Sequence, residues 1–360
     1  MKNILVTGGA GFIGSNFVRF LLEKEPDVHV YNFDLLTYAG SLENLKNLPS
    51  PTRHTFIHGD IGDADLLDRI FSEHAIDTVV HFAAESHVDR SILGPEAFIQ
   101  TNIIGTFKLL QTARKHWLTG ASTLDGYRFH HVSTDEVFGS LAPQDPAFEE
   151  TTPYSPNSPY SASKASSDHL VRAYFHTYGL PVSLTNCSNN YGPYQFPEKF
   201  VPLMIFNAMM GKPLPVYGDG QQIRDWLYVE DHCEAIWRVL KFGKVGETYN
   251  IGGNNQPTNL EVLDSICAIL DERLPQSPFR PHASLKTFVK DRPGHDRRYA
   301  INITKVNTEL GWAPRHNLKA GLEATIDWYL NNTAWLQAIS KNDEFQNWLD
   351  NNYEKRGGNQ

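Results

Sequence analysis

The sequence predicts an α/β protein with a parallel sheet covered by helices on both faces and a smaller second domain. Three observations support this. Apolar runs rich in β-branched residues alternate with amphipathic segments through the first half of the chain. A glycine-rich turn joins the first run to the first amphipathic segment. After about residue 180 the alternation is lost, and Pro and Gly become frequent. The predicted class is a Rossmann-type doubly wound parallel sheet with a smaller mixed α/β substrate domain.

Apolar and amphipathic runs give the expected order of elements. Two long helices are predicted at 95–117 and 159–178, and the second begins with Pro159, which is favoured in the first helical turn. A strand at 248–253 would return to the sheet. The other expected strands are 3–7, 28–34, 54–58, 78–83 and 128–133, with shorter helices at 13–23 and 64–74.

The loss of alternation also predicts the domain division. Residues 1–188 form the nucleotide-binding domain, to which 226–252 return, and residues 189–225 and 253–360 form the substrate domain. In the polar tail, three aromatic residues are spaced as in a packed helix: Trp335, Phe345 and Trp348.

Composition excludes several classes of protein. With 360 residues, of which 41% are hydrophobic and 12% aromatic, the chain can bury a full core. Its net charge of −9 argues against a nucleic-acid binder. No apolar run approaches the ~18 residues of a membrane span, and glycines interrupt the first apolar stretch, so a cytoplasmic protein is expected. Cys187, Cys233 and Cys267 lie too far apart for a zinc motif, and no metal site is predicted.

A dinucleotide site is predicted at the start of the chain. The strand at 3–7 runs into Gly8, Gly11 and Gly14 and then into a helix, whose free N–H groups suit a pyrophosphate. Asp34 ends the second strand and can accept both ribose hydroxyls, while it would repel a 2′-phosphate. No Lys or Arg lies between Asp34 and Lys46. We therefore expect NAD⁺ rather than NADP⁺, with Asp60 and Ile61 placed to contact the adenine.

Tyr160 and Lys164 form a candidate catalytic pair. They stand four residues apart at the start of a predicted helix, so they share one face. An ammonium group beside a phenol is expected to lower the pKa of the phenol. The tyrosine could then take a proton from a sugar hydroxyl during oxidation.

These motifs together resemble the extended short-chain dehydrogenase/reductase family, in its branch that modifies nucleotide sugars. The resemblance rests on the glycine motif, Asp34 and the run YSASKA, and it spans nearly the whole chain. The matching stretches are HFAAESHVDRSI (81–92), HVSTDEVFG (131–139), SPYSASKASSDHLVRAY (158–174), TNCSNNYGPYQFPEK (185–199), GDGQQIRDWLYVEDH (218–232) and DRPGHDRRYAIN (291–302).

The resemblance implies a 4,6-dehydratase, a hydro-lyase that borrows redox chemistry. Thr134 would contact the C4 hydroxyl that is oxidised with Tyr160. Asp135 would protonate the leaving C6 hydroxyl, and Glu136 would remove the C5 proton. Elimination of water needs one acid and one base at neighbouring carbons, and different surroundings can separate the pKa values of two carboxyls. The implied product is a 4-keto-6-deoxy sugar, with the cofactor regenerated in each turnover.

The resemblance also implies the binding residues. Lys199 and Arg224 make independent sense as charge-assisted donors to a diphosphate, although on charge alone each fits an ordinary surface cation. The implied substrate contacts are Ser86, Thr134, Asn189, Lys199, Phe200, Pro215, Tyr217, Arg224, Asn259, Asp291 and His295. The implied cofactor contacts are Gly8, Gly11, Phe12, Ile13, Gly14, Asp34, Thr37, Asp60, Ile61, Ala83, Thr101, Tyr160, Lys164 and Asn190.

The expected partner is a hexose carried on a nucleoside diphosphate, with dTDP-glucose as the first choice. A UDP-sugar 4,6-dehydratase or a 4-epimerase of the same family is the enzymatic alternative. An NAD-sensing regulatory protein is the non-enzymatic one, and it should have lost Tyr160, Lys164 or the acidic pair. The family also implies a homodimer through the helices at 95–117 and 159–178.

Overall fold

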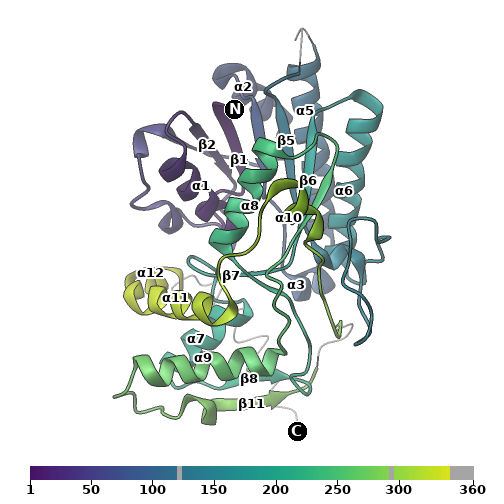
Figure 1. The fold of residues 1–360 in the computed structure, drawn as a ribbon. Coiled ribbons are helices and arrows are strands. Elements are labelled where there is room, and N and C mark those ends of the chain that lie inside the picture. Colours follow the sequence, from purple (N-terminus) through teal and green to yellow (C-terminus); the bar gives the residue numbers. More distant parts are fainter. Residues whose placement is uncertain (120–123, 292–295, 341–360) are drawn as a thin grey trace.

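The computed structural model describes residues 1–119, 124–291 and 296–340. Its centre is a seven-stranded sheet with the order β10-β6-β5-β4-β1-β2-β3, in which all neighbours are parallel (Figure 1). The order reverses beside β1, which places a crevice at the carboxyl ends of the strands. The predicted Rossmann-type class is confirmed. The strands are β1 (Asn3–Thr7), β2 (His29–Asp34), β3 (His54–His58), β4 (Thr78–His81), β5 (Arg128–Thr134), β6 (Val182–Cys187) and β10 (Thr248–Ile251).

Helices cover both faces of the sheet, because alternate residues of each strand point to opposite sides. Ile4 and Val6 of β1 pack in one apolar cluster with α1 and α8. Leu5 packs in another with α2, α5 and α6. The sheet is therefore buried on both faces, as expected of a parallel sheet. These helices are α1 (Phe12–Lys24), α2 (Ala64–His74), α5 (Thr106–Leu118), α6 (Pro159–Tyr178) and α8 (Val229–Phe242).

Both predicted long helical runs are present, and the first contains a π-helical stretch. Helix α6 begins at a capping box formed by Ser158 and Ser161 and ends at Gly179, whose φ of 71° suits glycine. The helical run predicted at 95–117 is present over residues 96–118, but it is not α-helical throughout. Between α4 (Glu96–Phe98) and α5 the backbone widens into a π-helix over Ile99–Gly105. Such π-helical turns occur frequently at functional sites. A short α3 (Val88–Leu93) precedes this run.

Strand β6 is absent from the predicted strands, although it lies between β5 and β10. All six of its residues are buried. Its sequence, VSLTNC, alternates apolar residues with polar ones, and Ser183 and Thr185 bond the ring of His130 inside the sheet. Polar residues paired inside a core conceal a buried strand from a hydrophobicity pattern.

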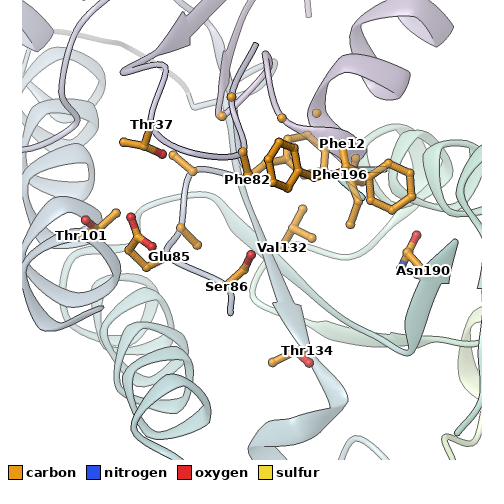
Figure 2. Close-up of a pocket in the computed structure, with 18 of the residues that line it drawn as sticks. Phe12, Thr37, Phe82, Glu85, Ser86, Thr101, Val132, Thr134, Asn190 and Phe196 are labelled. Carbon is orange, nitrogen blue, oxygen red and sulfur yellow. The ribbon is translucent and has the colours of Figure 1, made fainter. Parts of the chain in front are cut away.

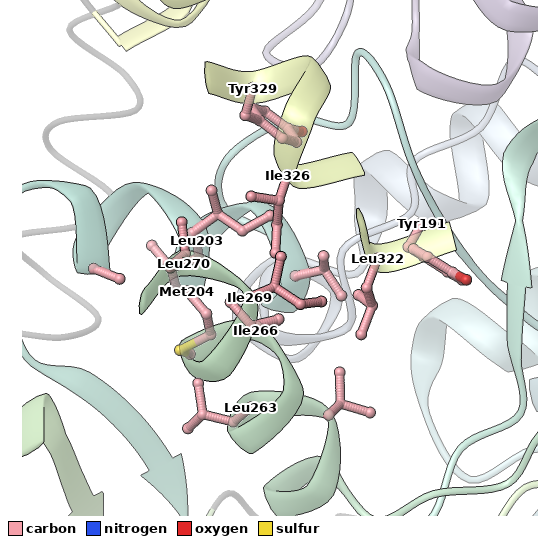
Figure 3. Close-up of a cluster of buried hydrophobic side chains, with 14 of the residues drawn as sticks. Tyr191, Leu203, Met204, Leu263, Ile266, Ile269, Leu270, Leu322, Ile326 and Tyr329 are labelled. Atoms are coloured by element: carbon pink, nitrogen blue, oxygen red, sulfur yellow. The ribbon is translucent and has the colours of Figure 1, made fainter. Parts of the chain in front are cut away.

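The second half of the chain builds a separate apolar core below the sheet (Figures 1 and 3). Leu263 and Ile266 of α9 and Leu322 and Ile326 of α11 form its centre. Two small parallel sheets flank it, pairing β7 with β9 and β8 with β11. The elements are β7 (Asn189–Tyr191), α7 (Phe200–Met209), β8 (Leu214–Tyr217), β9 (Trp226–Tyr228), α9 (Asn259–Arg273), β11 (Lys286–Val289), α10 (Thr304–Leu310), α11 (Leu318–Asn331) and α12 (Thr333–Ser340).

The last described helix ties the two halves together. Trp335 of α12 is buried and donates its indole N–H to Asn44 at 2.8 Å. Phe345 and Trp348, predicted to continue this helix, lie outside the described residues. Among the described residues no helix is long and apolar enough to cross a membrane.

Candidate active site

The glycine turn after β1 is shaped for close contact. Gly8 has a φ of 72°, and a Cβ there would lie 2.6 Å from the backbone nitrogen of Ala83. A Cβ on Gly14 would lie 2.2 Å from the carbonyl oxygen of Gly8. Neither position tolerates a side chain. Because Gly11 caps the amino end of α1, the free N–H groups of the helix open onto this turn.

Asp34 is held rigidly at the carboxyl end of β2. One carboxylate oxygen accepts from the backbone N–H of Ala10 at 2.9 Å and the other from Leu36 at 2.8 Å. Burial raises the pKa of this carboxyl, and the two backbone donors oppose that rise. Each oxygen retains a lone pair, so the group can still accept from the two hydroxyls of a ribose.

A cavity of about 330 Å³ lies at the carboxyl ends of the parallel strands. Thr101 and Asn190 lie on opposite sides of it, with Ser86 and Val132 between them (Figure 2). Every residue predicted to contact the cofactor lines this cavity: Gly8, Gly11, Phe12, Ile13, Gly14, Asp34, Thr37, Asp60, Ile61, Ala83, Thr101, Tyr160, Lys164 and Asn190. The glycine turn, the ribose acceptor and the cavity fit a dinucleotide.

The tripeptide predicted to be catalytic, Thr134 to Glu136, follows β5 into the same cavity. Thr134 ends the strand, and its hydroxyl accepts from the backbone N–H of Glu136 at 3.2 Å. That contact caps a short 3₁₀ turn over Asp135–Phe138. The Thr134 hydroxyl also hydrogen-bonds Tyr160. The structure thus brings Thr134, Asp135, Glu136 and Tyr160 together at one end of the cavity.

Asp135 and Glu136 stand in different surroundings. Asp135 is 1% exposed, whereas Glu136 is only partly buried. Burial, and then the negative charge of Glu136, raise the pKa of Asp135 well above its ordinary value. Asp225 adds to this rise, and the Arg224 guanidinium opposes it. Asp135 is therefore a carboxylic acid that keeps its proton where an exposed aspartate would be ionised.

In the structure the pKa of Tyr160 shifts upward overall, so the lowering expected from Lys164 stays a prediction. Burial and the charge of Glu136 raise the pKa of the phenol well above its ordinary value. The Lys164 ammonium instead donates to the carbonyl oxygen of Val132 at 2.9 Å and lies 3.3 Å from His131 Nε2. Helical spacing places the two residues on one face, but it does not decide where a long lysine chain directs its charge.

Three predicted substrate residues besides Thr134 line the cavity. Lys199 donates its ammonium to the carbonyl oxygen of Ser86 at 3.1 Å, which brings two distant segments together. Asn189 starts β7 beside them. This end of the cavity offers a cation and polar groups next to the acidic pair, as a diphosphate sugar requires.

The other predicted substrate residues lie outside this cavity. Phe200 starts α7 and packs its ring against Trp226 at 5.9 Å. Pro215 lies in the buried part of β8. Asn259 and Asp291 meet at Gln222, whose carbonyl oxygen accepts from the Asn259 N–H at 2.9 Å and whose side-chain amide donates to Asp291 at 3.0 Å. Tyr217 ends β8, and Arg224 also lies outside the cavity. His295 lies outside the described residues.

Arg224 is buried, not a surface cation. It is 6% exposed, and its guanidinium lies 4.4 Å from the ring centre of Tyr299. It donates to the carbonyl oxygens of Ile223 at 2.8 Å and Asp296 at 2.9 Å. Its charge also acts on Asp135. The guanidinium therefore belongs to the region around the acidic pair.

Several residues that line the cavity are not among those predicted from the sequence. Phe82 and Glu85 follow β4, Val132 belongs to β5, and Phe196 precedes α7 (Figure 2). The rule that ligands bind at the carboxyl ends of parallel strands would have found the first three. No sequence signal marks Phe196, which the fold of the second half brings to the cavity.

The fold and site define a class: enzymes that hold a dinucleotide on a Rossmann-type sheet and act on a polar substrate beside it. Residues 5–325 match the GDP-mannose 4,6 dehydratase family. The chain belongs to that family, within the extended short-chain dehydrogenase/reductases. It is 57% identical over 340 residues to the dTDP-glucose 4,6-dehydratase of Xanthomonas campestris pv. campestris, which covers 94% of this chain and 96% of that one. It is 55% identical over 362 residues to the dTDP-glucose 4,6-dehydratase of Salmonella typhimurium, covering 98% and 99%.

Solved structures of enzymes with two different activities share the fold of this chain. The dTDP-glucose 4,6-dehydratase of Streptomyces venezuelae, crystallised with NAD, superposes with a TM-score of 0.84 at 46% identity, covering 94% of this chain and 99% of that one. The UDP-glucose 4-epimerase of Thermotoga maritima reaches 0.80 at 30% identity, covering 92% and 99%. The fold alone therefore does not separate a dehydratase from an epimerase.

Proposed function

We propose that this chain is an NAD-dependent dTDP-glucose 4,6-dehydratase that converts dTDP-glucose to dTDP-4-keto-6-deoxyglucose and water. The relatives with 55% and 57% identity over nearly the whole chain carry that name. The activity requires a base, an acid and a group that handles the proton of the C4 hydroxyl. Glu136, Asp135 and Tyr160 supply these functions within one cavity.

The observation that carries the proposal is the burial of Asp135 directly beside a second, partly exposed carboxyl. Elimination across C5 and C6 needs a proton for the leaving hydroxyl and a base for the C5 hydrogen. Two exposed aspartates or glutamates would both be ionised. Burial of Asp135 beside the partly exposed Glu136 raises the pKa of Asp135, which supports Asp135 as the acid.

The reaction begins at the C4 hydroxyl. Tyr160 and Thr134, which hydrogen-bond each other, orient that hydroxyl, and its proton passes to Tyr160 in the ionised form, which the positive charge of bound NAD⁺ would favour against the effect of burial. Bound NAD⁺ supplies a hydride acceptor at C4 and later the hydride donor at C6. The resulting C4 ketone acidifies the C5 hydrogen. Glu136 takes this hydrogen as a proton, and Asp135 gives its own proton to the departing C6 hydroxyl. A proton then returns to C5.

The alternatives differ from this reaction in which residues they need. A 4-epimerase shares the fold and the oxidation at C4, but it eliminates no water and has no use for a buried acid beside Glu136. A UDP-sugar 4,6-dehydratase would use the same acidic pair, so the choice of dTDP rests on the named relatives. An NAD-sensing protein would need neither carboxyl.

NAD⁺ rather than NADP⁺ suits the cavity. Asp34 presents two anchored carboxylate oxygens where the adenosine ribose is expected, and a 2′-phosphate there would meet a negative charge. The relatives crystallised with NAD support the same choice.

The residue roles, the domain division and the assembly complete the proposal. Lys199, Ser86 and Asn189 would hold the diphosphate sugar, with Arg224 and its neighbours beyond them. The nucleotide domain would comprise residues 1–188 and 226–252.

Three exposed apolar side chains on the two long helical runs support a homodimer through those helices: Ile99, Ile104 and Tyr178, at 48%, 39% and 42% exposure. A cytoplasmic location stays a prediction.

Incubation with dTDP-glucose and, separately, UDP-glucose tests the function. A 4-keto product that absorbs in alkali should form from dTDP-glucose, and faster than from UDP-glucose. Deuterium placed at C4 of the hexose should be found at C6 of the product, and C5 should take its hydrogen from solvent. A product inverted at C4 that retains its C6 hydroxyl would establish an epimerase instead.

A further inference from the structure

Asp168 lies on α6 four residues after Lys164, just as Lys164 lies four residues after Tyr160. The three side chains therefore share one helix face. Lys164 and Asp168 are 4% and 0% exposed. Between them lies His131 of β5, whose Nε2 is 3.3 Å from the Lys164 ammonium and 3.2 Å from Asp168 Oδ1. The ammonium and the carboxylate are thus within two hydrogen-bond lengths of each other.

The second oxygen of Asp168 is held as well. It accepts from the Ser133 hydroxyl at 2.8 Å and from the Tyr154 hydroxyl at 2.9 Å. Burial alone would raise the pKa of Asp168, but the hydrogen bond and charge of His131 and the charge of Lys164 outweigh it, and the pKa lies below its ordinary value. The buried group is a carboxylate.

The imidazole between the two charges is neutral. Burial, and then the charge of Lys164, lower the pKa of His131 to about 4, against the opposing pull of Asp168. One positive and one negative charge therefore remain in a space that solvent does not reach. Burying either charge without the other is strongly unfavourable.

We propose that Asp168, acting through His131, is a positioning residue for Lys164. Its carboxylate is the countercharge that keeps the buried ammonium protonated and bonded to the Val132 carbonyl at the edge of the active-site cavity. The proposal deepens the proposed function, on which the role of Lys164 in catalysis rests. The pairing of the two charges is a property of the chain itself.

Other ionisable groups lie next to this pair, and none of them changes its charge between about pH 7 and 10. Arg172 of α6 donates to the Tyr154 hydroxyl at 2.9 Å and stays charged throughout. The other four are His81 on β4, Tyr154 before α6, Tyr160 on α6 and Cys187 on β6. Burial lowers the pKa of His81 well below its ordinary value, raises the pKa of Cys187 to about 12, and raises those of both tyrosines. These four groups stay neutral between about pH 7 and 10. Lys164 is the member of the cluster whose charge can change there.

The acidic pair after β5 lies next to this cluster. Beyond burial, the charges of Glu136 and Asp135 raise the pKa of Tyr160, and that of Asp135 also raises the pKa of Cys187. Both carboxyls are common to the parent protein and to the variants below, so their titration cancels in each comparison.

Asp168→Asn tests the pairing without substrate or cofactor. Burial already lowers the pKa of Lys164, and loss of the Asp168 charge should lower it by about 1–3 further units. A lysine whose pKa is lower in the folded than in the unfolded chain makes stability rise with pH through that window. The melting temperature of Asp168→Asn should therefore lie below that of the parent at neutral pH, and the deficit should shrink toward about pH 9–10.

Two further variants separate pairing from general damage. In Lys164→Met/Asp168→Asn neither charge remains, so its deficit should not shrink as the pH rises over this range. Asp231→Asn on α8 removes another buried carboxylate, which accepts from the backbone N–H groups of Arg315 and His316 at 3.0 and 2.9 Å and lies 3.0 Å from the His316 ring nitrogen. Its cationic neighbour, Arg315 at 3.9 Å, stays charged over this range, so the deficit of Asp231→Asn should not shrink as the pH rises. A deficit of Asp168→Asn that stays constant with pH would overturn the proposal. If the single variant does not fold, a folded double variant supports the pairing, and an unfolded one overturns it.

Activity supplies the second readout. In Asp168→Asn the alkaline limb of the kcat/KM profile for dTDP-glucose should move to lower pH by about one unit or more. An unmoved limb would mean that Asp168 serves only the packing of α6. If the parent protein does not act on dTDP-glucose, the proposed function fails, whereas the melting experiment still decides whether Asp168 pairs with Lys164.

Discussion

Replacing Asp135 with Asn should abolish most of the activity and leave the protein at least as stable as the parent near neutral pH. Asp135 is the proposed proton donor to the leaving hydroxyl, and an amide cannot donate in its place. Loss of a general acid lowers turnover by ~10²–10⁴-fold, equivalent to about 3–5 kcal/mol in the barrier. The expected stability follows from the same burial that makes the group an acid.

The size of the stability effect follows from linkage. The pKa of Asp135 is raised well above 3.8 in the folded protein, so the folded state binds this proton more tightly than the unfolded chain does. The contribution of Asp135 to stability is full below the unfolded pKa and is lost as pH rises toward the folded one. The loss is about 1.4 kcal/mol per pH unit within that window. Asn has no such loss, so the variant should gain on the parent by up to that amount between about pH 5 and 6.

Denaturant unfolding of both proteins at these pH values measures the difference in the free energy of unfolding, and product absorbance in alkali measures turnover. Asp231→Asn serves as the control. It removes a buried carboxylate that accepts two backbone N–H bonds, so it should lose about 1–3 kcal/mol and keep its activity. The free energy of unfolding of Asp135→Asn relative to the parent should change across this pH window. If it stays constant, the raised pKa of Asp135 is refuted. Near-normal turnover would refute its role.

Four further substitutions test the rest of the site. Asp34→Arg should abolish NAD⁺ binding or shift preference toward NADP⁺, because a cation replaces the ribose acceptor; equilibrium titration with both cofactors measures this, and unchanged NAD⁺ affinity would remove Asp34 from the site. Tyr160→Phe should slow turnover by ~10²–10⁴-fold, and a normal rate would exclude the phenol from the first step. Glu136→Gln should still oxidise C4 but not eliminate water, so quenched reactions should contain a 4-keto-glucose nucleotide, and its absence would contradict the assignment of the base. Lys199→Ala should raise KM strongly with a smaller effect on kcat, and an unaltered KM would place the diphosphate elsewhere.

Much of the nucleotide-binding half follows from the sequence because its determinants are local. A glycine turn between a strand and a helix, and an acid at the end of the next strand, need only neighbouring residues to be recognised. All fourteen residues expected around the cofactor line one cavity, since the carboxyl ends of parallel strands meet at one edge of the sheet. The strand at 182–187 was missed because its buried polar side chains are satisfied by partners that only the folded sheet provides.

By itself, the sequence determined the fold class, the likeness to nucleotide-sugar enzymes and the residue types that could carry out an elimination. Only the tertiary structure decided how deeply each of these residues is buried and in which direction its pKa shifts. It buried Asp135 and left Glu136 partly exposed, which separates an acid from a base that look equivalent in the chain. It turned Lys164 toward the Val132 carbonyl oxygen and His131, and it placed Asp168 on the same His131 nitrogen. The physical reason is that a pKa depends on burial and on charges brought close by folding, and neither is encoded in any short stretch of sequence.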